Sequence, residues 1–153
     1  MTIAKRLEDL GISLPAVSAP LAAYVPTART GNLLFISGQG PIVDNRIVSR
    51  GRLGETISVE EGVKAARLAA VNAMAAIAAA VGSLDKVARI VKLNGYVNSA
   101  NDFDQQHIVI NGASELLVEV FGEKGRHARA AVGMNALPMG MPVEIELVVE
   151  VAD

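Results

Sequence analysis

The chain lacks cysteine and tryptophan altogether, and aromatic residues make up only 3% of its 153 residues. Without cysteine it forms no disulfide and has no thiol chemistry, which is compatible with the cytoplasm. Hydrophobic residues nevertheless reach 51%. We therefore expect a core built from Ala, Val, Leu and Ile, in one domain spanning residues 1–153.

A membrane-spanning run and a basic excess are also missing. The longest apolar stretch, 68–81, is mostly Ala with Asn72 inside it, and is too short to span a bilayer. Because the mean hydropathy is +0.36, we interpret this stretch as a buried or subunit-facing helix. The net charge is −2, which makes nucleic-acid binding unlikely. Charged residues interrupt the N-terminus, so we expect no signal peptide and a cytoplasmic protein without membrane contact.

Helices are indicated by capping residues and apolar periodicity. Ser58 and Glu61 form a capping box that begins a helix ending before Gly82. A second long helix is predicted over about 111–121, and a short one over 2–10 opens an N-terminal extension, residues 1–23. Alternating runs predict strands at 27–30, 33–37, 88–97, 128–134 and 143–151. This order indicates an α/β (α+β) sandwich with the helices on one face of the sheet.

The last quarter of the chain contains two alternating runs separated by the turn-forming segment 137–142. We predict that these runs pair as an antiparallel hairpin. Folded about residues 136 and 137, the hairpin would place Arg129 opposite Glu144. The polar face would then present a guanidinium and a carboxylate side by side.

Several motifs together resemble one family. They are GNLLFISGQGP at 31–41, Asn72, LDKV at 84–87, Tyr96-Val97, Asp102-Phe103, Asn111, Ala128-Arg129 and VEIE at 143–146. In order and spacing they resemble the RidA/YjgF family of reactive-intermediate (enamine/imine) deaminases, once called L-PSP endoribonucleases. The resemblance implies a chorismate-mutase-like fold, with a mixed sheet and two main helices on one face. It also implies a homotrimer whose pockets lie between subunits.

The same resemblance implies a function and a set of site residues. Active members hydrolyse 2-imino acids to 2-oxo acids and ammonia without a cofactor or metal. Arg129 corresponds to the arginine that binds the substrate carboxylate, and Glu144 to the glutamate that positions water. The pocket positions correspond to Tyr24, Ser37, Asn111 and Ala131. A guanidinium suits a planar carboxylate, and a carboxylate can serve as the general base.

The chain departs from the family pattern at a few positions. His127 replaces a common proline, Ala131 replaces a frequent cysteine, and residues 104–110 include a few extra residues. These changes affect the predicted pocket shape and substrate size.

Simpler structural explanations exist for each site residue. Arg129 could be a solvated arginine of the sheet, and Glu144 has two siblings, Glu146 and Glu150, on the same predicted face. Tyr24 could be a half-buried ring, Ser37 a strand end and Asn111 a helix N-cap. His107 and His127 lack a third ligand at a workable spacing, so we expect no metal site.

Two other functions remain open. One is a non-catalytic trimer that binds small carboxylates such as 2-oxo acids and reports to another protein. The other is the endoribonuclease activity attributed to some relatives, which the acidic balance and the lack of a basic aromatic stripe disfavour.

Overall fold

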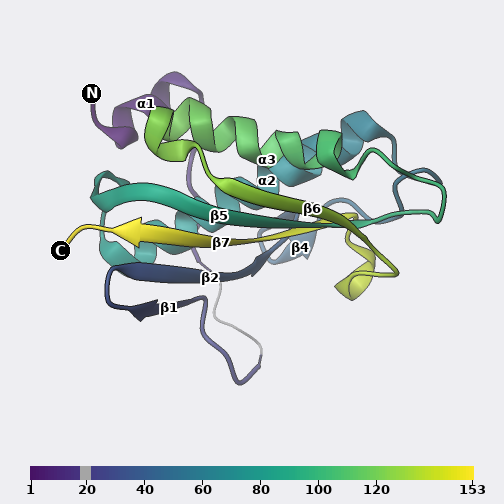
Figure 1. Cartoon of the computed structure of the whole chain (residues 1–153), viewed down its shortest axis with the longest axis horizontal. Helices are drawn as coiled ribbons and strands as arrows, with labels where there is room; N and C mark the ends of the chain where they lie inside the picture. Colours follow the sequence, from purple (N-terminus) through teal and green to yellow (C-terminus); the bar gives the residue numbers. More distant parts are fainter. Residues whose placement is uncertain (18–21) are drawn as a thin grey trace.

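A mixed five-stranded sheet forms the centre of the computed structural model, which describes residues 1–17 and 22–153. Its strand order is β1-β2-β7-β5-β6, which can be followed from bottom to top in Figure 1. The strands are β1 (Thr27–Thr30), β2 (Leu33–Gln39), β5 (Val87–Asn98), β6 (Ala128–Met134) and β7 (Val143–Val151). A separate small ribbon pairs β3 (Ile42–Val43) with β4 (Arg46–Ile47). The predicted class, a mixed α+β fold, is confirmed.

The predicted closing hairpin is wrong. β6 pairs in parallel with β5, whereas β7 lies between β2 and β5 and pairs with both in antiparallel fashion. The segment between β6 and β7 therefore crosses the end of β5 instead of turning back beside its own strand. Alternation in a sequence shows which residues share a face but does not identify the neighbouring strand.

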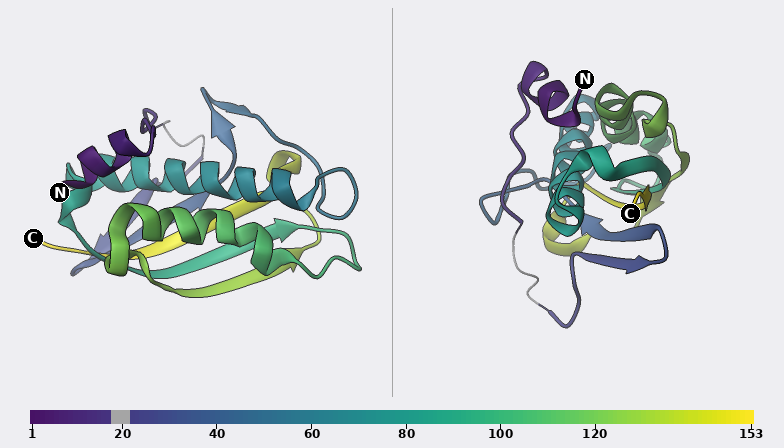
Figure 2. Two further views of the ribbon diagram at one scale, coloured as in Figure 1. Left: turned by 90° about the horizontal axis from the view of Figure 1, so that it is seen from above. Right: turned by 90° about the vertical axis from the view of Figure 1, so that its left-hand side faces the viewer.

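Helices α2 (Val59–Val81) and α3 (Gln106–Phe121) lie side by side on one face of the sheet, as Figure 2 shows. The capping box of α2 is present: Glu61 N donates to Ser58 Oγ at 3.2 Å, and Ser58 N donates to the Glu61 carboxylate at 3.1 Å. Gly82 ends the helix with a φ of 83°. The predicted short helix is α1 (Ile3–Asp9), capped by Thr2. Part of the predicted N-terminal extension, 18–21, falls outside the described residues.

Helix α2 is, among the described residues, the one helix long and apolar enough to cross a membrane by length and composition. Half of its most apolar window is buried inside the fold. Its buried residues, mostly Ala, pack in the core with strands β2 and β7 and with α3. This is the pattern of a core helix, so the described residues contain no clear membrane-spanning segment.

Helix α3 begins earlier than predicted, at Gln106. Its N-cap, Gln105, makes no side-chain capping bond, so the sequence carries no cap signal there. Val109 and Ile110 are fully buried in the core, and this tertiary packing holds the first turn. Asn111, considered above as an N-cap, therefore lies inside the helix.

The opposite face of the sheet carries apolar and acidic side chains. Val143, Ile145 and every second residue of β7 face the helices and are buried, so the three glutamates of β7 point the other way. Leu33, Phe35 and Val132 are 37%, 44% and 45% exposed. Three short 3₁₀ turns complete the described elements: η1 (Leu84–Lys86), η2 (Gly122–Gly125) and η3 (Pro138–Gly140).

Candidate functional site

Arg129 is held by helix α3. It pairs with Leu93 of β5, so its side chain lies on the helix-covered face at the sheet edge. Nη1 donates to Asn111 Oδ1 at 2.8 Å and to Ser114 Oγ at 3.2 Å, and Nη2 donates to the His107 carbonyl at 3.3 Å. A guanidinium carries five N–H groups. Contacts with the described residues use three of them, so two remain for a ligand.

Two predicted pocket residues accompany Arg129. Asn111 uses its amide oxygen to orient the guanidinium. Ala131 follows Arg129 by two residues in β6, on the same face, and is half-buried. The structure therefore groups Asn111, Arg129 and Ala131, although the substrate role of each stays a prediction.

Ser114 and His127 extend this group, and Ser114 is not among the residues that the sequence indicated. His127 Nδ1 lies 2.7 Å from the Gly125 carbonyl, and Nε2 lies 2.9 Å from Ser114 Oγ. A carbonyl can only accept, so Nδ1 carries the proton and the neutral ring accepts at Nε2 from the serine hydroxyl. Ser114 follows Asn111 by three residues, so both lie on the same face of a helix. This spacing could have indicated Ser114 as a neighbour of Asn111.

The charge state of His127 follows from its surroundings. Burial lowers the pKa of the imidazole, the bond to the Gly125 carbonyl partly opposes this, and the positive charge of Arg129 lowers it further. The ring is therefore neutral near pH 7. Neither His107 nor His127 belongs to a group of three metal-ligating side chains within 1–17 and 22–153.

A shallow hollow of about 240 Å³ opens over this cluster. It is lined by Ser114, Val118, Arg126, His127 and Arg129. We call His107, Asn111, Ser114, His127 and Arg129 the arginine cluster.

Glu144 lies elsewhere, opposite Tyr96 on the open face of the sheet. Its carboxylate rests against Gly38, where an added Cβ would stand 2.1 Å from Oε1. Burial raises the pKa of Glu144, and the nearby charge of Glu146 raises it further. The raised pKa makes this carboxylate a stronger base than that of an exposed glutamate.

The neighbouring Glu146 is engaged differently. It accepts hydrogen bonds from Asn94 Nδ2 at 3.1 Å and from the Tyr96 hydroxyl. The bond to Glu146 is the main reason that the pKa of Tyr96 is raised to about 12. No described residue donates such a bond to the Glu144 carboxylate, which distinguishes Glu144 from Glu146. We call Gly38, Tyr96, Glu144 and Glu146 the glutamate cluster.

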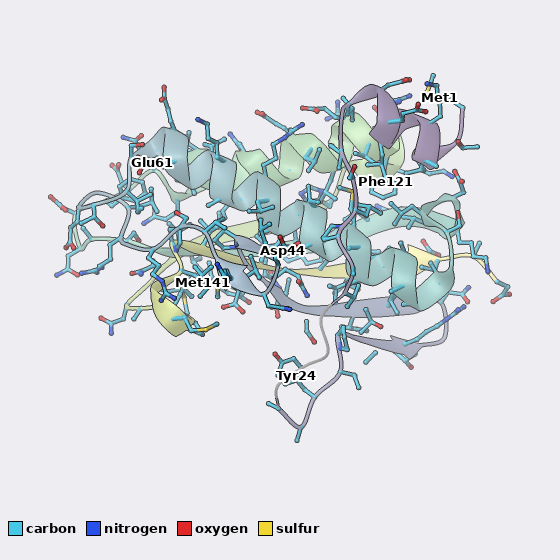
Figure 3. All side chains as sticks on the ribbon, turned by 180° about the vertical axis from the view of Figure 1, so that it is seen from behind. Met1, Tyr24, Asp44, Glu61, Phe121 and Met141 are labelled. Atoms are coloured by element: carbon cyan, nitrogen blue, oxygen red, sulfur yellow. The ribbon has the colours of Figure 1, made fainter. Side chains whose placement is uncertain are left out.

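Ser37 and Tyr24 lie near the glutamate cluster and not beside Arg129. Ser37 precedes Gly38, its hydroxyl donates to the Val25 carbonyl at 2.7 Å, and its N–H donates to the Pro26 carbonyl at 2.9 Å. These bonds fasten the loop that carries Tyr24. Tyr24 is 59% exposed on a projecting loop (Figure 3).

The predicted side-by-side placement of Arg129 and Glu144 is therefore wrong within one chain. Strand β5 separates β6 from β7, and the two side chains lie on opposite faces of the sheet. The residues predicted to form one pocket fall into two groups. Asn111, Arg129 and Ala131 form one, and Ser37 lies next to the Gly38–Glu144 contact in the other, while Tyr24 is exposed on the loop bonded to Ser37.

The molecule is thus a two-layered α+β sandwich, with the arginine cluster under α3 and the glutamate cluster on the open face of the sheet. Residues 4–151 match the family model described as "YjgF/chorismate_mutase-like, putative endoribonuclease". The chain belongs to this YjgF/chorismate-mutase-like family.

The chain is also similar to several known proteins. The chain is 47% identical to Protein TCP17 of Trypanosoma cruzi over 97% of this chain and 93% of that protein. A crystal structure from Shewanella oneidensis, described as a putative endoribonuclease, has a TM-score of 0.95 and 35% identity over 99% of this chain and 100% of that one. A 2-iminobutanoate/2-iminopropanoate deaminase of Dermatophagoides farinae is 28% identical over 90% of this chain and 93% of the relative.

Proposed function

We propose that this protein hydrolyses small 2-imino acids, or the enamines in equilibrium with them, to 2-oxo acids and ammonia. Arg129 carries the proposal, because α3 fixes its guanidinium while two N–H groups stay available. Two parallel N–H groups can bind a planar carboxylate through charge-assisted hydrogen bonds. The deaminase among the relatives supports the choice of substrate class.

The reaction needs one general base. As water adds to the C=N carbon, Glu144 takes a proton from the water and passes it to the nitrogen, which gives a carbinolamine. Glu144 then moves the proton of the new hydroxyl group to the nitrogen, the C–N bond breaks as the C=O bond forms, and ammonia leaves. The raised pKa of this carboxyl group suits both proton transfers. The reaction consumes only the imine and water, so the proposal includes no cofactor. Tyr24 and Ser37 would shape the glutamate side of the pocket, and Asn111 and Ala131 the arginine side.

We further propose that a complete site forms only between copies of the chain, most simply in a homotrimer. This proposal is supported by the opposite placement of Arg129 and Glu144 in one chain. It is also supported by the apolar side chains on the open face, where Phe35 and Val132 are 44% and 45% exposed. The absence of cysteine supports a cytoplasmic location.

The test is release of ammonia and 2-oxo acid from freshly generated 2-iminobutanoate or 2-iminopropanoate. Glu144→Gln is expected to lower turnover by about 10²–10⁴-fold, the usual contribution of a general base. Arg129→Ala is expected to weaken binding of 2-oxobutanoate by roughly 10- to 100-fold, because it removes hydrogen bonds to a charged group. Wild-type rates no higher than those of both variants would rule the activity out.

The same assays separate the two alternatives. Binding of 2-oxo acids without turnover would identify a carboxylate-binding trimer instead. Cleavage of single-stranded RNA that is lost in Arg129→Ala would identify an endoribonuclease. The net charge of −2 does not favour RNA as a partner.

A further inference from the structure

A serine hydroxyl and a neutral imidazole meet beside Arg129 in an arrangement that imine hydrolysis does not use. Ser114 Oγ lies 2.9 Å from His127 Nε2, and His127 Nδ1 donates to the Gly125 carbonyl at 2.7 Å. This is the order of contacts found in nucleophile–base pairs: a hydroxyl, a base within hydrogen-bond reach, and a third group that orients the base.

The orienting carbonyl is fixed by close packing. A Cβ added to Gly125 would lie 2.2 Å from the Leu117 carbonyl oxygen and 2.7 Å from its carbon. Only glycine lets the end of η2 approach the backbone of α3 this closely. This packing fixes the Gly125 carbonyl, and the carbonyl in turn orients the His127 ring.

We propose that Ser114 and His127 form a nucleophile–base pair that accepts the acyl group of small carboxylic esters bearing an anionic group. Oγ attacks the ester carbonyl carbon and its proton passes to Nε2. The new Oγ–C bond forms, the C–O bond to the alcohol breaks, and Nε2 returns the proton to the leaving oxygen. Water then hydrolyses the acyl-serine by the same proton transfers, so no other reactant is needed.

The charged side chains around Ser114 favour esters that carry an anionic group. Arg129 Nη1 lies 3.2 Å from Oγ, so the oxyanion that forms on the attacked carbon develops beside a fixed positive charge. Arg126 also lines the hollow, with Nε 3.0 Å from the Glu123 carboxylate. The volume of about 240 Å³ suits a small molecule. Two guanidinium groups favour an ester with a second, anionic end.

The experiment uses the full-length protein with two probes, para-nitrophenyl acetate and the mono-para-nitrophenyl ester of succinate. We expect a burst of nitrophenolate, faster with the anionic ester, and an acyl group mapped to Ser114 by peptide mass spectrometry. His127→Asn, which keeps a donor for the Gly125 carbonyl, is expected to slow acylation by about 10²–10⁴-fold. Ser114→Ala should abolish the burst, and Ser83→Ala, a serine at the start of η1, should retain it.

Mapping on the unmodified protein makes the test independent of whether a variant folds. Acylation confined to lysines or to the N-terminus, or equal rates for both esters, would overturn the proposal. Glu144→Gln separates this activity from imine hydrolysis. It should lose imine turnover yet still be acylated at Ser114, because Glu144 lies on the other face of the sheet.

Discussion

The negative charge of Glu144 destabilises the folded chain, because the carboxylate is half-buried and lies near Glu146. Burial and the charge of Glu146 raise its pKa above the ordinary 4.5. Below the ordinary value both the folded and unfolded chains are protonated at this group. As the pH rises, the unfolded chain releases its proton first, so the free energy of unfolding falls until the pH passes the raised folded pKa.

Replacing this carboxylate is therefore expected to stabilise the fold. Glu144→Gln should have a higher free energy of unfolding than wild type at about pH 7, and the difference should vanish at about pH 4. Urea denaturation at the two pH values measures it. Imine turnover by the wild type should fall as the pH drops through the raised pKa. A less stable glutamine variant at neutral pH would show that the charge is paired in solution.

Gly38 controls the position of the same carboxylate. Its φ is not in the left-handed region, but an added Cβ would stand 2.1 Å from Glu144 Oε1 and 2.9 Å from Cδ. These atoms end a flexible side chain, so the carboxylate and not the backbone should move. Gly38→Ala is expected to lower imine turnover by about tenfold or more, as for a misplaced catalytic group, with little change in melting temperature. Unchanged binding of 2-oxobutanoate, measured by calorimetry, would confirm that the arginine cluster is intact.

At the scale of elements, the contact between α2 and α3 depends on Gly112. A Cβ there would lie 2.1 Å from the carbonyl oxygen of Val63. Alanine gains about 1 kcal/mol over glycine in helix propensity, whereas overpacking costs about 1–3 kcal/mol. The close atom belongs to a backbone that cannot turn away, so the cost should exceed the gain.

Gly112→Ala is thus expected to destabilise the protein by up to about 2 kcal/mol, the difference between these two terms. Chemical denaturation followed by circular dichroism measures the change. Glu115→Ala, an exposed site in the same helix, is the control and should change stability by less than about 0.5 kcal/mol. A stabilised Gly112→Ala would mean that the helices can move apart freely.

Sequence signals that act within a few residues predicted the bounds of helices and strands better than the pairing of the strands. Ser58, Glu61 and Gly82 set the ends of α2 as expected, because caps act within a few residues. The first turn of α3 was missed, because burial of Val109 and Ile110 and not a cap holds it. The parallel partnership of β6 with β5 depends on contacts distant in sequence, on which alternation carries no information.

At the scale of the whole molecule, the sequence indicated some of the contacts around Arg129 and Glu144 but not the placement of these two residues relative to each other. Asn111 does contact Arg129, and Ser37 does lie next to the Gly38–Glu144 contact. The error was to place Arg129 and Glu144 together in one chain, since the sheet separates them. Alternation alone could not reveal this separation, because it does not tell which strand lies between β6 and β7 in the sheet.

The proposed division of the site between copies makes a sharp prediction for mixed assemblies. Arg129→Ala keeps the glutamate cluster intact, and Glu144→Gln keeps the arginine cluster intact. If a working site combines one cluster from each of two copies, coexpressing the two variants creates some interfaces that contain both native residues. Imine hydrolysis, assayed at imine concentrations too low to saturate Arg129→Ala, should then recover to about a quarter of wild type for random pairing of two copies, although each variant alone is nearly inactive under these conditions.

Two controls show whether the recovered imine hydrolysis comes from interfaces between the two variants. The double variant Arg129→Ala/Glu144→Gln, coexpressed with either single variant, offers no interface with both native residues and should stay inactive. Sedimentation of the wild type should show an oligomer under the assay conditions. If the mixture of single variants stays inactive while the oligomer forms, the two clusters do not act across a shared interface. Glu144 would then have no route to a carboxylate bound at Arg129, because the sheet of its own chain lies between them.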